Sequence, residues 1–128
     1  MFNLSAQSDT IVTKSGLKYV QIKPGNGEKP MKGSKIKVNY TGKLKNGDIF
    51  DSTADQGKPF KFKLGVGEVI KGWDEGFALM SKGEKGILII PPELGYGKKG
   101  VPDPYEDNVY VIPPNATLIF EVELLDFK

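Results

Sequence analysis

Residues 95–100, which read GYGKKG, are the stretch that most directly suggests ligand chemistry. They have the G-x-G-x-x-G spacing of loops that hold the pyrophosphate of a dinucleotide. Such a loop works where it leads into a helix, because the free N–H groups of the first helical turn bind the phosphates. Here VPDP follows, at residues 101–104, and two closely spaced prolines prevent a regular first turn. The spacing therefore does not predict a nucleotide site, and the tyrosine between the glycines, Tyr96, needs another explanation.

The residue inventory excludes several kinds of active site. The chain has no cysteine and no histidine. Cys–His nucleophiles, Ser–His–Asp triads and the usual zinc sites are therefore ruled out. We expect no metal and no cofactor, and any catalysis must proceed without the commonest proton carrier.

The basic residues do not favour a nucleic-acid ligand. All 18 are lysines, the net charge is +2, and acidic residues are interspersed among them. Arginine, whose planar fork suits phosphates and base edges, is missing. A nucleic-acid-binding β-domain remains a rival interpretation, and a steep salt dependence of binding would be its mark.

Length and composition indicate one folded domain. The chain has 128 residues, of which 38% are hydrophobic and 27% charged, close to globular averages. No apolar run approaches the roughly 18–20 residues of a membrane span, so we expect no membrane segment. The N-terminal MFNLSAQSDT lacks the basic start and apolar stretch of a signal peptide. The compartment stays open between the cytoplasm and, after removal of a signal segment, the periplasm.

Alternation of apolar and polar residues dominates the chain and predicts strands. Ile36, Val38 and Tyr40 alternate with polar residues, as in a strand with one buried face. Asn46-Gly47 is a strong signal for a two-residue hairpin loop after that strand. The second strand of that hairpin is expected from Ile49, and further strands near residues 17–23, 60–64, 86–90 and 118–124.

A single segment, residues 72–80, has the spacing of an amphipathic helix. Trp73, Phe77 and Met80 fall on one face, and Asp74 lies in the first turn, where the helix dipole favours an acid. So short a helix is stable only when packed against a sheet. Five to six strands and one short helix predict an α+β fold with an antiparallel sheet curled around the helix.

Several motifs, taken in order, identify a family. They are VNYTG (38–42), FDST (50–53), LGVGEVIKGWDEG (64–76), LGYG (94–97) and IPPNATL (112–118). This ordered set resembles the FKBP-type peptidyl-prolyl cis/trans isomerases. The resemblance runs from about residue 16 to residue 128, so we interpret residues 1–15 as an N-terminal extension and 16–128 as the isomerase domain.

The resemblance implies a half-barrel sheet wrapped on the helix, with a shallow apolar pocket between them. Asp51, Tyr96 and Phe50 are the expected catalytic residues. Tyr96, from the GYGKKG loop, would reach a substrate carbonyl with its hydroxyl, and Asp51 would lie at the pocket rim. The expected substrate-binding residues are Tyr40, Phe60, Val69, Ile70, Trp73, Ile112 and Phe120. The expected ligands are proline-containing polypeptides and macrolide inhibitors of the tacrolimus and rapamycin type, bound by a monomer.

Such a pocket suits isomerisation of an X–Pro bond, which neither makes nor breaks a covalent bond. The barrier of roughly 18–20 kcal/mol comes from lost amide resonance. An apolar, water-poor pocket is expected to favour the twisted amide over the planar one. In this hypothesis Phe50, Phe60, Trp73 and Phe120 grip the prolyl ring. Tyr96 and the Ile70 N–H hold the flanking carbonyls, while Asp51 favours the twisted amide electrostatically.

Other interpretations stay open from the sequence. The aromatic residues at strand and helix spacing could simply form the core, and Asp51 could be a surface aspartate in a turn. A chaperone or partner-binding module of the same fold with little catalytic role is the alternative function.

Two departures from the family pattern also stand out. Residues 53–57 offer no basic partner for Asp51, and residues 101–111 form a longer link than usual, either a flap over the pocket or a tolerated insertion.

Overall fold

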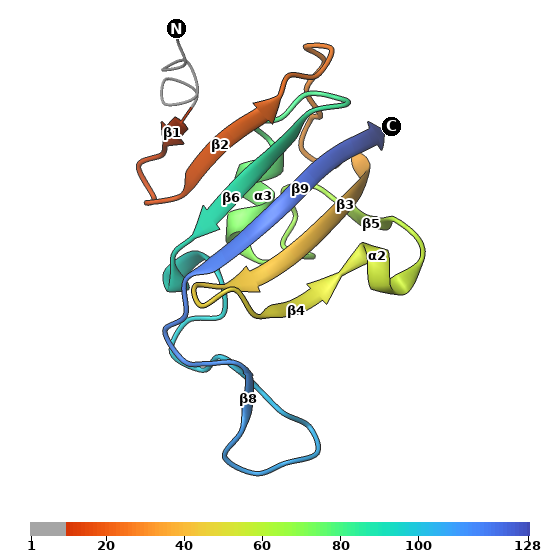
Figure 1. Cartoon of the computed structure of the whole chain (residues 1–128). Coiled ribbons are helices and arrows are strands. Elements are labelled where there is room, and N and C mark those ends of the chain that lie inside the picture. The colour runs from red at the N-terminus through yellow and green to blue at the C-terminus, as the bar shows by residue number, and fades with distance from the viewer. Residues whose placement is uncertain (1–9) are drawn as a thin grey trace, which may run out of the picture.

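The computed structural model describes residues 10–128, which form an open antiparallel sheet, a smaller two-stranded sheet and three short helices (Figure 1). The large sheet has the strand order β1-β2-β6-β9-β3-β4, and β5 also pairs with β3. Its strands are β1 (Thr10–Val12), β2 (Lys18–Lys23), β3 (Lys35–Leu44), β4 (Ile49–Ser52), β5 (Phe60–Lys63), β6 (Lys85–Ile90) and β9 (Leu118–Phe127). The small sheet pairs β7 (Val101–Pro102) with β8 (Tyr110–Ile112), and the helices are α2 (Thr53–Gln56), α3 (Lys71–Phe77) and the 3-10 helix η1 (Pro92–Leu94).

Strands β3 and β9 form the centre of the sheet and fix which side chains meet. They pair from Ile36 opposite Phe127 to Leu44 opposite Leu118. Along both strands buried and more exposed residues alternate, because successive side chains point to opposite faces. The pairing of Gly42 with Phe120 places that phenyl ring beside a residue without a side chain.

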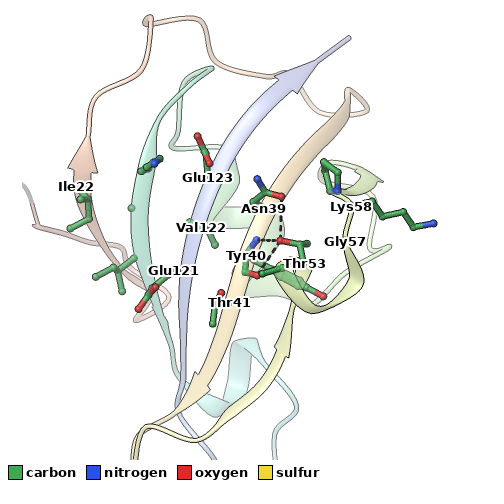
Figure 2. Close-up of a pocket in the computed structure, with 15 residues that line it drawn as sticks. Ile22, Asn39, Tyr40, Thr41, Thr53, Gly57, Lys58, Glu121, Val122 and Glu123 are labelled. Carbon is green, nitrogen blue, oxygen red and sulfur yellow. Dashed lines mark hydrogen bonds between the residues drawn. The ribbon is translucent and has the colours of Figure 1, made fainter.

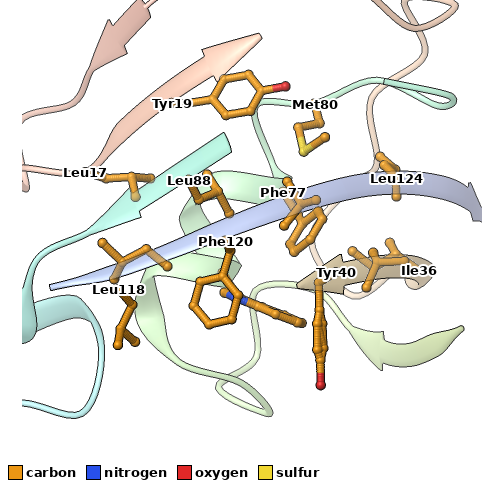
Figure 3. Packing of buried hydrophobic residues seen from close by; sticks show 14 of the residues in the cluster. Leu17, Tyr19, Ile36, Tyr40, Phe77, Met80, Leu88, Leu118, Phe120 and Leu124 are labelled. Atoms are coloured by element: carbon orange, nitrogen blue, oxygen red, sulfur yellow. The ribbon is translucent and has the colours of Figure 1, made fainter. Parts of the chain in front are cut away.

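Helix α3 packs against the inner face of the sheet and closes the core (Figure 3). Its Phe77 is fully buried, and its ring lies close to those of Phe62 and Trp73. A Cβ at Gly72 would lie 2.7 Å from Ile90, and one at Gly76 would lie 2.5 Å from Leu88. Both glycines therefore let the helix backbone sit directly on β6.

The predicted α+β class and the antiparallel sheet curled on a short helix are confirmed, with differences in detail. The large sheet has seven strands rather than five or six, because short β1 joins its edge. Strand β1 lies inside the segment interpreted as an extension; residues 1–9 of that segment lie outside the described residues. Helices α2 and η1 and the β7–β8 hairpin were not predicted, because single turns and two- or three-residue strands are too short to show a period.

Two predicted boundaries were wrong. Helix α3 ends at Phe77 rather than Met80, although Met80 is still fully buried in the turn that follows. The loop between β3 and β4 has four residues, 45–48, instead of two. Within it the Leu44 N–H donates to the Asp48 carbonyl, and Gly47 adopts a φ of 95°, which suits glycine.

Candidate active site

A cavity of about 300 Å³ opens between α3, β3, β4, β5 and the loops before α3 and after η1. Nine of the ten predicted site residues line it, together with Glu68. The lining is Tyr40, Phe50, Asp51, Phe60, Glu68, Val69, Ile70, Trp73, Tyr96 and Phe120. Strands distant in sequence thus bring the predicted aromatic set around one concavity.

The indole of Trp73 forms the floor of this cavity. Its ring centroid lies 4.8 Å from that of Tyr40 and 5.3 Å from that of Phe120, both in edge-to-face arrangements. Such arrangements of aromatic rings are favourable beyond the area that they bury. Trp73 Nε1 has no hydrogen-bond partner among the described residues, so packing alone fixes the indole.

The wall beside the floor depends on Gly42. Phe50 and Phe120 meet edge to face there, with centroids 5.5 Å apart. A Cβ at position 42 would lie 2.6 Å from the Phe50 ring and 2.7 Å from the Phe120 ring. The wall therefore needs a residue without a side chain at this position.

The aromatic side chains that line the cavity become more exposed to solvent from its floor to its rim. Tyr40, Trp73 and Phe120 are buried, whereas Phe60 and Tyr96 are 36% and 40% exposed. Burial, and then the charge of Asp51, raise the pKa of Tyr96. Its hydroxyl therefore stays protonated at neutral pH and can donate a hydrogen bond at the rim.

Asp74 holds the loop that carries Val69 and Ile70. Its carboxylate accepts hydrogen bonds from the Gly65 N–H at 2.8 Å and the Gly67 N–H at 3.0 Å. Both glycines have a φ of 81°, a conformation that other residues rarely adopt. Ile70 then caps the N-terminus of α3 in an extended conformation, and its N–H meets no acceptor among residues 10–128. That N–H is free to bind a carbonyl at the cavity.

Asp51 lies at the rim, held by three neutral donors. The Tyr40 hydroxyl donates to Oδ2 at 2.5 Å. The Gln56 amide donates to Oδ1 at 3.0 Å, and the Ser52 N–H donates to the same oxygen at 2.9 Å. Burial first, and then the hydrogen bond to Asp51, raise the pKa of Tyr40 to about 12, so this phenol is a donor at neutral pH.

Gln56 is a site residue that the sequence reasoning missed. Residues 53–57 contain no basic partner for Asp51, but the amide of Gln56, five residues after it, makes the contact. Thr53 ties the short helix of Gln56 to β3: its Oγ1 accepts from the Tyr40 N–H at 3.1 Å and donates to Asn39 Oδ1 at 3.2 Å (Figure 2). Ser52 caps that helix by accepting from the Ala54 N–H.

Ile112, the tenth predicted site residue, is not among the residues that line the cavity. It is 3% exposed, belongs to the core and pairs with Val101 at the base of the β7–β8 hairpin. The hairpin accounts for the long link after residue 100. Its tip is exposed, and Tyr105 there is 94% accessible.

A larger cavity, of about 720 Å³, lies elsewhere, on the outer face of the sheet (Figure 2). Outward side chains such as Thr41, Glu121 and Glu123 line it, and it lacks the ring cluster of the smaller cavity.

Within residues 10–128 no cluster of three acidic side chains is placed to hold a metal ion. None of the helices described has the length and hydropathy to cross a bilayer.

An open antiparallel sheet curled on one helix, with an aromatic cavity between them, is the arrangement that the resemblance in the sequence implies. The family model for "FKBP-type peptidyl-prolyl cis-trans isomerase" matches residues 26–125. The chain belongs to this family, and it is a peptidyl-prolyl isomerase.

Individual relatives of known name and structure support the same family assignment. The "FK506-binding protein 1" of Dictyostelium discoideum is 51% identical over 113 residues, which are 88% of this chain and 99% of the relative. The "Peptidyl-prolyl cis-trans isomerase Fkbp12" of Drosophila melanogaster is 50% identical over 86% of this chain and 96% of its own. The crystal structure of AtFKBP13 superposes with a TM-score of 0.85 at 42% identity, covering 93% of this chain and 98% of the other.

Proposed function

We propose that the aromatic cavity is where this isomerase holds a proline of a polypeptide while the preceding amide rotates. The observation that carries the proposal is the graded cavity itself: a buried floor, tightly packed walls and two half-exposed rings at the opening. Trp73 supports the flat side of the prolyl ring. The aromatic rings that enclose the prolyl ring belong to Tyr40, Phe50, Phe60 and Phe120. The aliphatic side chains of Val69 and Ile70 line the rest of the cavity.

The polar groups at the rim bind and polarise the peptide on either side of the proline. The Tyr96 hydroxyl and the Ile70 N–H hold carbonyls on either side of the rotating bond. The twisted amide has a less polar carbonyl than the planar amide, so it loses less on leaving water for an apolar cavity. The Asp51 carboxylate acts on the amide electrostatically, and in a dry site such a charge counts for more than in water. Each ~1.4 kcal/mol of preference for the twisted form gives a tenfold rate gain.

The ligands that we infer are proline-containing polypeptide segments and macrolides of the tacrolimus and rapamycin type. Relatives carry the name FK506-binding protein, and the cavity has the aromatic lining that an apolar ring of such a molecule needs. All lining residues come from one chain, so the site needs no second copy, and we propose that the protein acts as a monomer. Polypeptide, rather than nucleic acid or a membrane surface, is the partner that this lining fits.

Titration with tacrolimus, followed by Trp73 fluorescence, tests the proposed site. Trp73 is the one tryptophan of the chain and forms the cavity floor, so its emission reports occupancy directly. We expect a change in emission that saturates at one equivalent, and about tenfold weaker binding for Phe50→Ala, because a ring of the wall is lost. Tyr105→Ala, at the exposed hairpin tip, is the matched control and should bind unchanged. Calorimetric binding with unchanged emission would place the ligand elsewhere, and no binding would refute the macrolide part of the proposal.

A further inference from the structure

The charged residues at the mouth of the cavity are all acidic. Asp51 and Glu68 are the charged residues among those that line it, and both are exposed at the rim. The ion pairs recorded within residues 10–128 are Lys43–Glu121 and Lys82–Asp126, so neither rim carboxylate is in one. One Glu68 oxygen accepts from the Lys63 N–H at 2.9 Å, which fixes that side chain without neutralising it.

Gln56 gives Asp51 a direction without cancelling its charge. The amide and the Ser52 N–H share Oδ1, and the Tyr40 hydroxyl takes Oδ2, so both oxygens are oriented by neutral donors. A basic side chain in place of Gln56 would supply similar hydrogen bonds but would also remove the net charge. The Asp51 charge acts across the cavity, since it helps to raise the pKa of both Tyr40 and Tyr96.

The position of Gln56 is built into the fold. Its helix is a single turn, which has no stability of its own. The Thr53 hydrogen bonds to β3 hold that turn beside Tyr40 (Figure 2), and the Ser52 cap stabilises its first residues. Gln56 therefore reaches Asp51 from a fixed point on the same strand–helix unit that carries the carboxylate.

We propose that Gln56 is a positioning residue that keeps Asp51 as an oriented, uncompensated anion, and that the isomerase therefore favours a positively charged over a negatively charged residue before the proline. The inference rests on the proposed use of the aromatic cavity and adds the substrate class to it. A lysine or arginine before the proline places its cation at the rim, where Asp51 and Glu68 attract it. A glutamate at the same place is repelled.

Three peptides that differ only in the residue before proline, lysine, leucine or glutamate, test the preference by exchange NMR. We expect kcat/KM for the lysine peptide to exceed that for the glutamate peptide by about tenfold. The rim carboxylates attract the lysine and repel the glutamate, and each interaction has the strength of an exposed charge pair, so their effects multiply. Salt at about 1 M, where the screening length is near 3 Å, should remove most of this ratio.

Variants of Gln56 separate orientation from charge. Gln56→Arg should lower the lysine-to-glutamate ratio to about twofold, and dividing each rate by that of the leucine peptide removes any loss common to the three. Gln56→Ala should slow all three peptides and preserve the ratio, because the carboxylate loses its orientation but keeps its charge. Asp55→Asn, on the same helical turn, changes the local charge by the same amount without touching Asp51, so it should leave the ratio near tenfold.

The outcomes are distinct. Equal turnover of the three peptides, or a ratio that Gln56→Arg and Asp55→Asn change alike, would overturn the inference and leave the proposed function intact. Failure to isomerise any peptide would overturn the proposed function and the inference together.

Discussion

Gly42→Ala is expected to remove most of the isomerase activity while the protein stays folded. The new methyl group would lie 2.6 Å from the Phe50 ring and 2.7 Å from the Phe120 ring, so both rings must move. Overpacking of this kind costs about 1–3 kcal/mol of the free energy of unfolding. Because the two rings form the cavity wall, we expect kcat/KM for a prolyl peptide to fall by at least about tenfold, equivalent to ~1.4 kcal/mol of transition-state stabilisation.

The double variant Gly42→Ala/Phe50→Leu distinguishes crowding from a general effect of alanine in β3. A leucine at position 50 leaves room for the methyl group, so the double variant should be more stable to urea than the Gly42→Ala single variant. The cycle measures the coupling between the two positions. A Gly42→Ala protein with wild-type kcat/KM would show that the Phe50–Phe120 wall takes no part in catalysis.

Phe77→Ala should have the largest effect on stability of any single substitution considered. Phe77 is fully buried, joins α3 to the sheet and contacts the Phe62 and Trp73 rings. Truncation of such a ring costs about 3–5 kcal/mol through lost transfer energy and the cavity left behind. Since the free energy of unfolding of such a domain is roughly 5–15 kcal/mol, the variant should be only marginally stable at 37 °C.

Urea unfolding, followed by far-UV circular dichroism and by Trp73 fluorescence, measures this loss. Tyr105→Ala, at a position that is 94% exposed, is the control and should change the free energy of unfolding by less than about 0.5 kcal/mol. A Phe77→Ala protein with a wild-type midpoint would mean that α3 is held to the sheet by other contacts.

Periodicity predicted the parts of the fold that bury a continuous face. Strand β3 shows this, because Ile36, Val38 and Tyr40 alternate over enough residues to fix which face is inward. The same signal was too weak for β7 and β8, whose pairing depends on a long loop returning to itself. The end of α3 was overextended because Met80 keeps the helical spacing although the chain has already left the helix.

The candidate site was predicted by motif resemblance rather than by periodicity. Nine of the predicted residues do line one cavity, but no sequence pattern separates Ile112 from them, because it has the same apolar character although it lies in the core. Gln56 was missed for a physical reason. Its role depends on a one-turn helix that directs an amide back toward Asp51, and no linear pattern marks that geometry.

Exchange NMR on an X–Pro peptide tests catalysis in the aromatic cavity more directly than any binding measurement, because it follows rotation of the bond itself. The uncatalysed exchange takes tens to hundreds of seconds, so a mixing time of about 1 s gives no cis–trans cross-peaks without a catalyst. With the wild-type protein at about one hundredth of the peptide concentration, we predict clear cross-peaks that disappear when tacrolimus fills the cavity. Cross-peaks that persist at saturating, bound tacrolimus would place catalysis outside the aromatic cavity, and their absence from the start would mean that the protein does not accelerate X–Pro rotation.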